Sequence, residues 1–545
     1  MDAKRFVRFA RTSCVVVVTA TTVLLTEAWA AAPAAKPEVA PKARVASVPK
    51  TPAAAPQTRM RWQDFISGSD GAKRLASLQA AVTKMKSLDT SPKNSADYRR
   101  SWEYWANIHG YYGSQSPDGT VAQQIAYLKS QGMGSYVPYY QGITDQTPPD
   151  AIAKKVWATC QHSGQTQALN FFGWHRMYLY YFERVLRWAS GDNTLRLPYW
   201  DYTDPAQLAI PASFQSQSSP LYDAKRDPGI NDGSSTLEAG STDVNDLLPI
   251  KAYFTYESKI EEGIHGYVHC TVGPTCPVAH MGDVPVAGND PVFYSHHANI
   301  DRLWACWQKL HKTPSGAWQS QKFSFPDETG ALQTKPVKDF LSSVPLGYVY
   351  DNDTACSRST TLEAAAVPMA ETEQKKAMVS TSKSIAIKQA VTSVDLDVPA
   401  PKIKSAFESV KPPGSVELIL HDITADNHPG VLFNVFLAKK ADPSVRQQVG
   451  TISWFGAFRH HGSQGPVKKT LSFDITRKLR ALGDPGGAGL TVVIEATEGR
   501  AGTGPKLEAM RKEASEHFRP EANLKIGSIE LRAVPDTPPA PQKKK

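Results

Sequence analysis

Cysteine is scarce in this chain, with six residues among 545. The sequence contains no Cys-x-x-Cys-His run, which excludes covalent haem attachment of that kind. It contains no His-Glu-x-x-His run either, which excludes a zinc hydrolase of that type. The glycines at 486–487 lack the following Lys-Ser or Lys-Thr pair of a phosphate-binding loop, so we interpret them as part of a turn.

The chain also lacks a basic body. Its net charge of +9 comes from residues 1–60 and from the final lysines 543–545, and the remainder is neutral. A neutral body does not favour nucleic-acid binding, so no nucleic-acid partner is expected. Hydrophobic residues make up 41% of the sequence and charged residues 21%, which supports a packed core and excludes wholesale disorder.

The N-terminus is typical of a secretory signal. Four basic residues precede an apolar stretch from Cys14 to Leu25, and Ala28-Trp29-Ala30 offers a cleavage site. The stretch is shorter than the about 20 residues that span a bilayer, and no Arg-Arg pair precedes it to indicate twin-arginine export. We predict a signal peptide over residues 1–30 and an exported protein, periplasmic or secreted, with no membrane association after cleavage. An uncleaved anchor is the alternative.

Composition divides the rest of the chain into domains. Residues 31–60 are rich in Ala, Pro and Lys and predict a flexible tether. Residues 61–356 repeat apolar positions three and four apart, which predicts a helical domain. Residues 357–413 lack a core pattern and predict a linker that proteases can reach. Alternating apolar residues over 414–535 predict a small C-terminal β-sandwich, followed by a basic tail at 536–545.

Histidines cluster in the helical region, where nine of the fourteen lie between residues 109 and 311. Seven of them fall into two groups. The first group is His109, His162 and His175; the second is His265, His269 and the pair His296-His297.

The spacing within these groups favours a metal site. His265 and His269 are four residues apart, which places two imidazoles on one face of a helix. Glu262 lies three residues before His265, as carboxylate-bridged di-iron bundles require, but the other histidines have no such partner. Two groups of imidazoles without an obligatory carboxylate favour copper among the metals that imidazole binds.

Two long motifs surround these histidines. Residues 174–183 read WHRMYLYYFE, and residues 290–304 read DPVFYSHHANIDRLW. They resemble the first and second copper motifs of the tyrosinase, catechol oxidase and haemocyanin group. Residues 197–201, 219–223 and 346–350 resemble motifs of plant polyphenol oxidases, and the C-terminal strands are loosely similar to the shielding domain of those enzymes. The resemblance covers about residues 62–535.

The resemblance implies a mainly α catalytic domain, in which a central four-helix bundle holds a dicopper centre, followed by a small C-terminal β-sandwich domain. It implies one copper ion held by His109, His162 and His175, and a second copper ion held by His265, His269 and His297. In the family the second of the paired histidines is the ligand, so His296 is assigned to packing. Arg176 and Asp301 lie beside ligands and are expected to orient imidazoles or to tie helices together.

The cysteines fit the same resemblance. Cys160-Gln161-His162 matches an arrangement that forms a thioether between Cys160 and His162 in some members, and a buried thiol is the alternative. Cleavage of the signal removes Cys14, so four cysteines remain. Of the three possible pairings we favour Cys270 with Cys276 and Cys306 with Cys356.

The implied activity is the oxidation of o-diphenols to o-quinones with dioxygen, and hydroxylation of monophenols is left open. Glu261 matches the glutamate that holds a water near the second copper in the family, with Glu262 as the alternative. Gly266 stands where tyrosinases often carry an Asn that orients this water, which disfavours hydroxylation. Val284 stands where many catechol oxidases carry a bulky Phe, and it leaves room for a substrate.

The resemblance also implies a latent form, in which the C-terminal domain covers the copper site and aromatic residues of 454–461 plug it. Phenolic small molecules and dioxygen are the expected partners. Two other functions compete with oxidation: dioxygen binding without turnover, as in haemocyanins, and a copper protein that has lost its activity.

Overall fold

The computed structural model describes part of the chain, which begins at residue 55 and ends at residue 534. Within it the undescribed residues are 115–119, 131–133, 142, 144–146, 164–169, 275, 277–279, 352–355, 357–377, 381–383, 397–414, 458–466 and 484–488. The predicted signal peptide, most of the predicted tether and the basic tail therefore lie outside the described residues. Among the described residues, every helix is too short or too polar to cross a bilayer.

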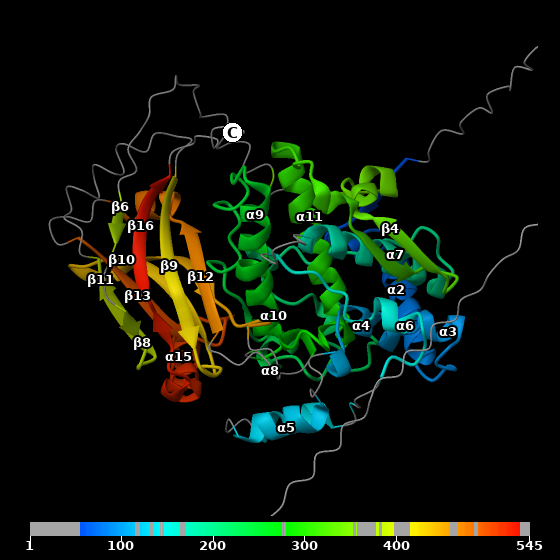
Figure 1. The fold of residues 1–545 in the computed structure, drawn as a ribbon, viewed down its shortest axis with the longest axis horizontal. Helices are drawn as coiled ribbons and strands as arrows, with labels where there is room; N and C mark the ends of the chain where they lie inside the picture. The colour runs from blue at the N-terminus through cyan, green and yellow to red at the C-terminus, as the bar shows by residue number, and fades with distance from the viewer. Residues whose placement is uncertain are drawn as a thin grey trace, which may run out of the picture. The chain divides into compact units, whose positions relative to one another are not determined.

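The N-terminal part is helical; α7 and α11 are its long helices, and α9 and α10 lie on its side next to the C-terminal strands (Figure 1). Its helices are α1 (Trp62–Phe65), α2 (Gly71–Ser87), α3 (Ala96–Arg99), α4 (Trp102–His109), α5 (Val121–Ser130), α6 (Ala153–Val156), α7 (Phe171–Ser190), α8 (Pro228–Asn231), α9 (Tyr253–Ile260), α10 (Gly266–Val272) and α11 (Val292–Leu310). Its short strands are β1 (Gln57–Arg59), β2 (Thr236–Leu237), β3 (Lys322–Pro326), β4 (Leu332–Pro336) and β5 (Tyr348–Tyr350).

Local sequence signals set the ends of these helices. The Ser101 hydroxyl accepts a hydrogen bond from the Tyr104 N–H at 3.1 Å and caps α4. Asp290 accepts a hydrogen bond from the Val292 N–H at 2.9 Å at the start of α11, next to Pro291. Gly191 ends α7 with a φ of +70°, a left-handed conformation that glycine adopts without steric cost.

Between α9 and α10 the chain forms a π-helical turn, Glu261–His265. At Gly263 the backbone is not helical, with ψ at −106°. Such a turn adds a residue to the helix and changes the direction of the side chains that follow it, and it is frequent at functional sites. The turn therefore decides where His265 points relative to His269 in α10.

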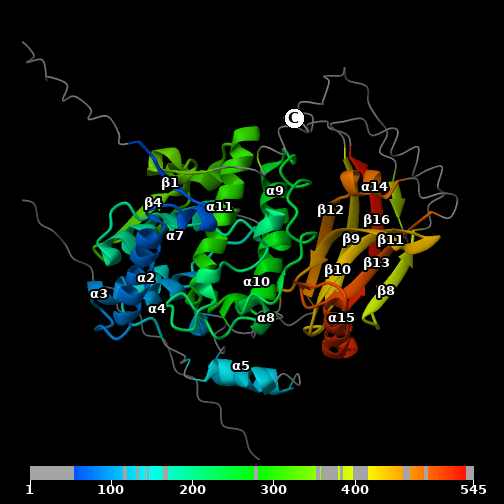
Figure 2. The same cartoon turned by 180° about the vertical axis from the view of Figure 1, so that it is seen from behind.

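The C-terminal part is a β-sandwich whose two helices, α14 and α15, lie at opposite ends of the strands (Figure 2). One antiparallel sheet has the order β11-β10-β13-β8, and the other contains β6-β16-β9-β15-β7 with β12 on β9. The elements are β6 (Met378–Ser380), β7 (Ile385–Ala386), β8 (Val391–Asp395), β9 (Ser415–Ala425), β10 (Leu432–Lys439), β11 (Asp442–Ile452), β12 (Val467–Asp474), α14 (Thr476–Leu482), β13 (Leu490–Thr497), β14 (Arg500–Ala501), α15 (Pro505–His517), β15 (Lys525–Ile526) and β16 (Ser528–Val534).

The two sheets share one apolar core. Leu418 and Leu420 of β9 belong to the same buried cluster as Val435 of β10 and Ile494 of β13. Alternation of apolar residues on these strands is the pattern that identified the sandwich, because successive side chains of a strand point to opposite faces. The helices α14 and α15 were not predicted, since they follow turns inside a region that otherwise reads as strands.

Two predicted domain boundaries are wrong. The tether does not extend to residue 60, because β1 pairs with β5 and Arg59 is fully buried in the helical domain. The linker does not extend over 378–396, because β6, β7 and β8 are strands of the sandwich. Strand β1 is short and polar, and β6, β7 and β8 have only 3, 2 and 5 residues, so only pairing with distant parts of the chain gives these segments structure. The rest of the predicted linker lies outside the described residues.

Two disulfides lie in the part of the chain that the structure describes. Cys270 is joined to Cys276, with Cα atoms 4.9 Å apart, and Cys306 is joined to Cys356, with Cα atoms 5.4 Å apart. These are the pairs that the sequence analysis favoured. The second disulfide fastens the end of the helical domain to α11.

A buried ionic cluster centred on Asp301 joins α7, α11, β1 and β5. The Asp301 carboxylate accepts hydrogen bonds from Arg176 at 2.5 Å, from Tyr348 at 2.7 Å, from Tyr350 at 2.6 Å and from Arg59 at 3.3 Å. Burial alone would raise the pKa of Asp301, but Arg176 and Arg59 lower it below its usual value. Asp301 and Arg176 thus join α11 to α7, and Arg59 adds the N-terminal strand.

The Asp301→Asn substitution should destabilise the helical domain by about 3–5 kcal/mol, because it leaves two buried guanidinium groups without this counter-charge. Urea denaturation of the purified variant measures the loss. Glu508→Gln is the control, since Glu508 and Arg511 form an exposed pair with side-chain exposures of 72% and 41% whose loss should cost less than about 1 kcal/mol. Equal small losses in both variants would contradict the assigned importance of the cluster.

Candidate metal centre

Two groups of histidines face each other in the core of the helical domain. His109 from α4, His175 from α7 and His297 from α11 form one group, and the other is formed by His265, His269, His296 and His297. In each group the candidate ligand atoms lie within 4.8 Å of one another. His297 belongs to both groups, and its ring stacks on that of His175 with centroids 4.4 Å apart.

Backbone carbonyls orient four of these imidazoles. In each case Nδ1 donates a hydrogen bond to a carbonyl oxygen: His109 to Val284 (2.9 Å), His175 to Phe171 (2.7 Å), His265 to Glu261 (3.1 Å) and His269 to Met281 (2.7 Å). A proton on Nδ1 leaves the lone pair on Nε2, so each ring offers Nε2 to a metal. One short segment, 281–284, supplies the carbonyls for a histidine of each group.

Burial keeps these imidazoles neutral. It lowers the pKa of His109 to about 3, and lowers the pKa of His175, His265, His269 and His297 well below the usual value. Neutral imidazole is the form that binds a metal ion. The site therefore needs no loss of protons from these rings before a cation enters.

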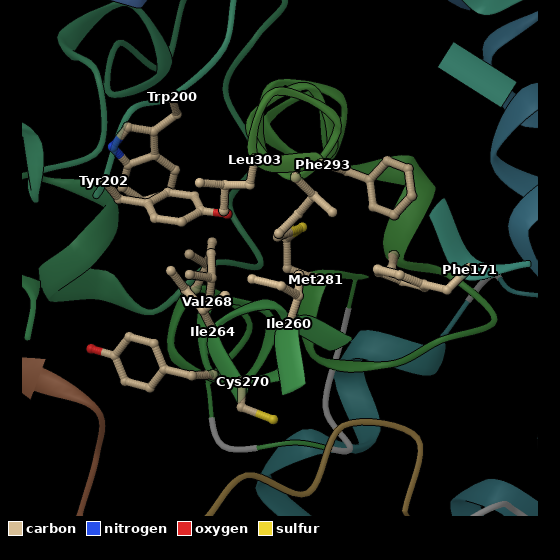
Figure 3. Close-up of a cluster of buried hydrophobic side chains, with 14 of the residues drawn as sticks. Phe171, Trp200, Tyr202, Ile260, Ile264, Val268, Cys270, Met281, Phe293 and Leu303 are labelled. Atoms are coloured by element: carbon tan, nitrogen blue, oxygen red, sulfur yellow. The ribbon is translucent and has the colours of Figure 1, made fainter. Parts of the chain in front are cut away.

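Aromatic and apolar side chains enclose the histidines. Phe171 contacts His265 at a centroid distance of 4.9 Å, and Phe293 contacts His297 at 4.3 Å. Figure 3 shows Phe171, Met281 and Phe293 among the buried side chains packed around α10 and α11. A shell of this kind excludes water and strengthens electrostatic interactions inside the site.

The donor set fits copper. Nε2 of His265 and Nδ1 of His297 are buried without a hydrogen-bond partner, which is costly unless a ligand satisfies them. The two groups offer only imidazole nitrogens, and no carboxylate oxygen belongs to either group among the described residues. Imidazole sets without carboxylates suit copper among the divalent metals, whereas calcium and magnesium require oxygen ligands.

His162 is not a member of either group in the described structure. Its Nδ1 lies 2.6 Å from Oε1 of Glu261. Burial is the main cause that lowers the pKa of His109 and of His175, and electrostatic interaction with His162 is a smaller cause for both. His162 therefore lies near the first group. Sγ of Cys160 lies 3.5 Å from Nε2 of His175, and the thioether to His162 stays a prediction.

The two candidate glutamates differ in their contacts. The second carboxylate oxygen of Glu261 accepts a hydrogen bond from the Ser163 N–H, so both oxygens already bind the chain. Burial raises the pKa of Glu262, although Lys469 of β12 acts in the opposite direction. A water-holding role for either residue stays a prediction.

The paired histidines have different surroundings. Nδ1 of His296 lies 2.8 Å from the Tyr202 hydroxyl, while its Nε2 is buried without a partner. His297 has no comparable contact to a tyrosine among the described residues, and its Nε2 lies 3.4 Å from Nε2 of His269. Sequence reasoning missed Tyr202, because nothing in its local pattern distinguishes it from a core tyrosine.

A segment of the sandwich packs onto the second group. The ring of Phe455 stacks on that of His269, with centroids 3.8 Å apart and planes inclined by 10°. Ser453 Oγ donates a hydrogen bond to the Glu262 carbonyl at 3.2 Å. The structure thus places one aromatic residue of the predicted plug, Phe455, against the site, and residues 458–461 of that plug lie outside the described part.

The two positions predicted to influence substrate access both face this segment. A Cβ on Gly266 would lie 2.7 Å from Ser453 Oγ, which is too close. A Cβ on Gly456 would lie 3.5 Å from a methyl group of Val284. Gly266 and Val284 therefore line the place where the sandwich meets the site.

Comparison with known proteins gives the following matches. The family model described as the common central domain of tyrosinase matches residues 99–245 and 233–310. The chain is 30% identical over 358 residues to a latent-form polyphenol oxidase, named chloroplastic, from Prunus armeniaca, covering 57% of this chain and 59% of the relative. It is 29% identical over 307 residues to a tyrosinase of Hahella sp. (strain CCB-MM4), covering 50% of this chain and 59% of the relative. The chain thus spans about three fifths of the length of these relatives.

Solved structures show the same fold over most of the chain. A latent aurone synthase, a polyphenol oxidase, superposes with a TM-score of 0.54 at 19% identity over 90% of this chain and 91% of that chain. A latent apple tyrosinase superposes with a TM-score of 0.52 at 19% identity over 88% of this chain and 98% of that chain. The predicted fold class, a mainly α domain followed by a β-sandwich, is confirmed.

The paired histidines provide a test of the site. The His297→Ala substitution should lower bound copper from about two ions per chain to about one or fewer, because both groups lose a ring. His296→Ala is the matched control and should keep both ions, since His296 is assigned to packing. Metal analysis after copper loading and dialysis measures the difference, and circular dichroism checks the fold. Copper loss in the His296 variant alone would reverse the assignment.

Proposed function

From the match of residues 99–245 and 233–310 to the common central domain of tyrosinase, we propose that this chain is a copper oxidoreductase that oxidises o-diphenols to o-quinones with dioxygen. The observation that carries the proposal is the pair of facing, neutral imidazole groups that share His297. Hydroxylation of monophenols is a second activity that the test below addresses.

Six histidines form the proposed ligand set. His109, His162 and His175 hold one copper ion, and His265, His269 and His297 hold the other. Copper bound there supplies the electron transfer between the phenol and dioxygen. The chain itself holds the rings in place through the carbonyls of 281–284 and of the preceding helical turns, and it excludes water with Phe171 and Phe293.

A contact between the sandwich and His269 supports the proposal that the substrate is aromatic. The ring of Phe455 stacks on the face of His269 with centroids 3.8 Å apart, and a phenol ring is able to stack in the same way. Val284 and Gly266, which lie against the same segment of the sandwich, are both small residues. We therefore propose that a phenol binds where Phe455 now lies.

A dioxygen-binding protein without turnover is the second candidate. The observation that favours it is Phe455 itself, because a plug on His269 excludes a phenol more strongly than it excludes the small dioxygen molecule. In that case the sandwich would be a permanent cover, and its removal would not produce an oxidase.

Oxygen uptake separates these functions. The copper-loaded chain should consume little oxygen with catechol, and limited proteolysis that releases the sandwich should raise the rate at least about tenfold. Uptake with catechol but not with a simple monophenol would identify a catechol oxidase, and uptake with both would identify a tyrosinase. No uptake after cleavage, despite bound copper, would contradict the oxidase and favour the oxygen binder.

We also propose that the sandwich keeps the enzyme latent. Polar contacts fasten it to the helical domain: Glu238 accepts hydrogen bonds from Asn434 at 2.9 Å and Thr497 at 3.0 Å, and Asp243 pairs with Lys478 at 2.9 Å. Cleavage within 357–377 would release the whole sandwich. Cleavage within 397–414 would instead leave β6, β7 and β8 on the helical side of the cut.

The Phe455→Ala substitution should raise the activity of the uncut chain. Removing this ring weakens docking by about 1.5–3 kcal/mol, so the open fraction rises by about tenfold or more. Gly266→Asn should act in the same direction, because its side chain collides with Ser453. The matched control is Phe436→Ala, which removes a ring of the same sandwich that packs on Arg446. Unchanged rates with catechol in the uncut Phe455 variant would refute latency by this plug.

Export is a further part of the proposal. It rests on the pattern of residues 1–30, namely basic residues, an apolar stretch and a small-x-small site. The word chloroplastic in the names of plant relatives describes those relatives and does not locate this chain. Sequencing of the mature N-terminus after secretion by a bacterial host would show whether cleavage follows Ala30.

A further inference from the structure

Residues 281–285 form a strap between the ends of two helices that carry proposed ligands. The Met281 carbonyl accepts a hydrogen bond from Nδ1 of His269 in α10. The Val284 carbonyl accepts one from Nδ1 of His109, the last residue of α4. These two histidines belong to different groups, so the strap decides which ring nitrogen faces a metal in both of them.

The strap lies directly against the backbone at both helix ends. A Cβ on Gly110, the residue that follows α4, would lie 2.9 Å from Cα of Pro285. A Cβ on Gly273, the residue that follows α10, would collide with the backbone N of Gly282. Neither glycine has a positive φ, so the close approach of the strap, rather than the conformation of the backbone, requires glycine at these two positions.

Asp283 anchors the middle of the strap. Its side chain is buried, and its Oδ2 accepts hydrogen bonds from the hydroxyls of Tyr112 at 2.6 Å and Tyr140 at 2.9 Å. Burial raises the pKa of Tyr112 well above its usual value, so this hydroxyl keeps the proton that it donates. A carboxylate acceptor makes such bonds stronger than bonds between neutral groups. The carboxylate therefore holds the two carbonyls on either side of it in place.

We propose that Asp283 is a positioning residue that sets the tautomers of His109 and His269 through the strap and thereby supports both copper sites at once. The part that concerns copper rests on the proposed function. Two other rings provide an internal comparison, because His175 and His265 bond carbonyls of their own helical segments. Those two rings should not respond to a change in the strap.

Nitrogen NMR of the copper-free, full-length chain with isotope-labelled histidine reads the tautomers without any assay of activity. In the wild type all four rings should carry their proton on Nδ1. In Asp283→Ala, the rings of His109 and His269 should show a mixture of tautomers, because the two carbonyls of the strap are no longer held. The rings of His175 and His265 should keep the proton on Nδ1.

Copper retention supplies the second readout. In a titration of the copper-loaded chain with a chelator, Asp283→Ala should release both ions about 10–100-fold more readily than the wild type. Asp283→Asn should recover part of the affinity, since its amide oxygen still accepts a bond from one tyrosine. Asp327→Ala is the matched control, because Asp327 is also buried and accepts several hydrogen bonds, in the turn between β3 and β4. It should change neither the tautomers nor the copper affinity.

Should Asp283→Ala fail to fold, Tyr112→Phe replaces it, because it removes one donor and keeps the ring. Unchanged tautomers of His109 and His269 would overturn the proposal. An equal change in all four rings would do so as well, by showing a general loosening of the core, and so would the release of a single copper ion. A wild-type chain that binds no copper would instead refute the proposed function, and the NMR result would still decide the role of Asp283.

Discussion

The structure depends on the hydrogen bonds that orient its buried, uncharged imidazole rings. Histidines packed against one another cannot all be protonated, and burial keeps them neutral. A neutral ring has one donor and one acceptor, so the hydrogen bond at Nδ1 decides which lone pair faces the centre. The carbonyls of Met281 and Val284 make that choice for rings on two different helices. The segment 281–284 and these helices must therefore stay in register for the two hydrogen bonds to form.

The Asp301 cluster shows how that register is maintained. It lies on the same two helices as His175 and His297 and binds them to strands β1 and β5. A carboxylate that accepts four hydrogen bonds permits only one relative position of its partners. Packing of aromatic rings fills the space between helices. The directional hydrogen bonds of the ionic cluster define how the helices and strands are positioned relative to one another.

The sequence predicted what depends on local pattern and missed what depends on distant pairing. The motifs around His175 and His297 identified the helices and most of the histidines that the structure brings together, because ligand spacing on a helix is a local property. Arg59 was placed in a flexible tether, since nothing near it shows that its partners, Glu183 and Asp301, lie far along the chain. The carbonyl acceptors were equally invisible, because any residue carries one. The sequence predicted that aromatic residues of 454–461 plug the site. Only the structure shows that Phe455 is the residue that stacks on His269.

Strand β1 has a consequence for how the protein is matured and produced. Its three residues pair with β5, and Arg59 at its end is completely buried. A protease that trims the N-terminus can therefore remove the residues that precede Gln57 without breaking the pairing of β1 with β5, whereas trimming through Arg59 would extract a cation from the interior of the domain. The lower limit of a stable fragment lies between those two residues, close to where the alanine- and proline-rich stretch ends. Expression designs that begin at the first motif-bearing helix would discard the strand that closes the ionic cluster.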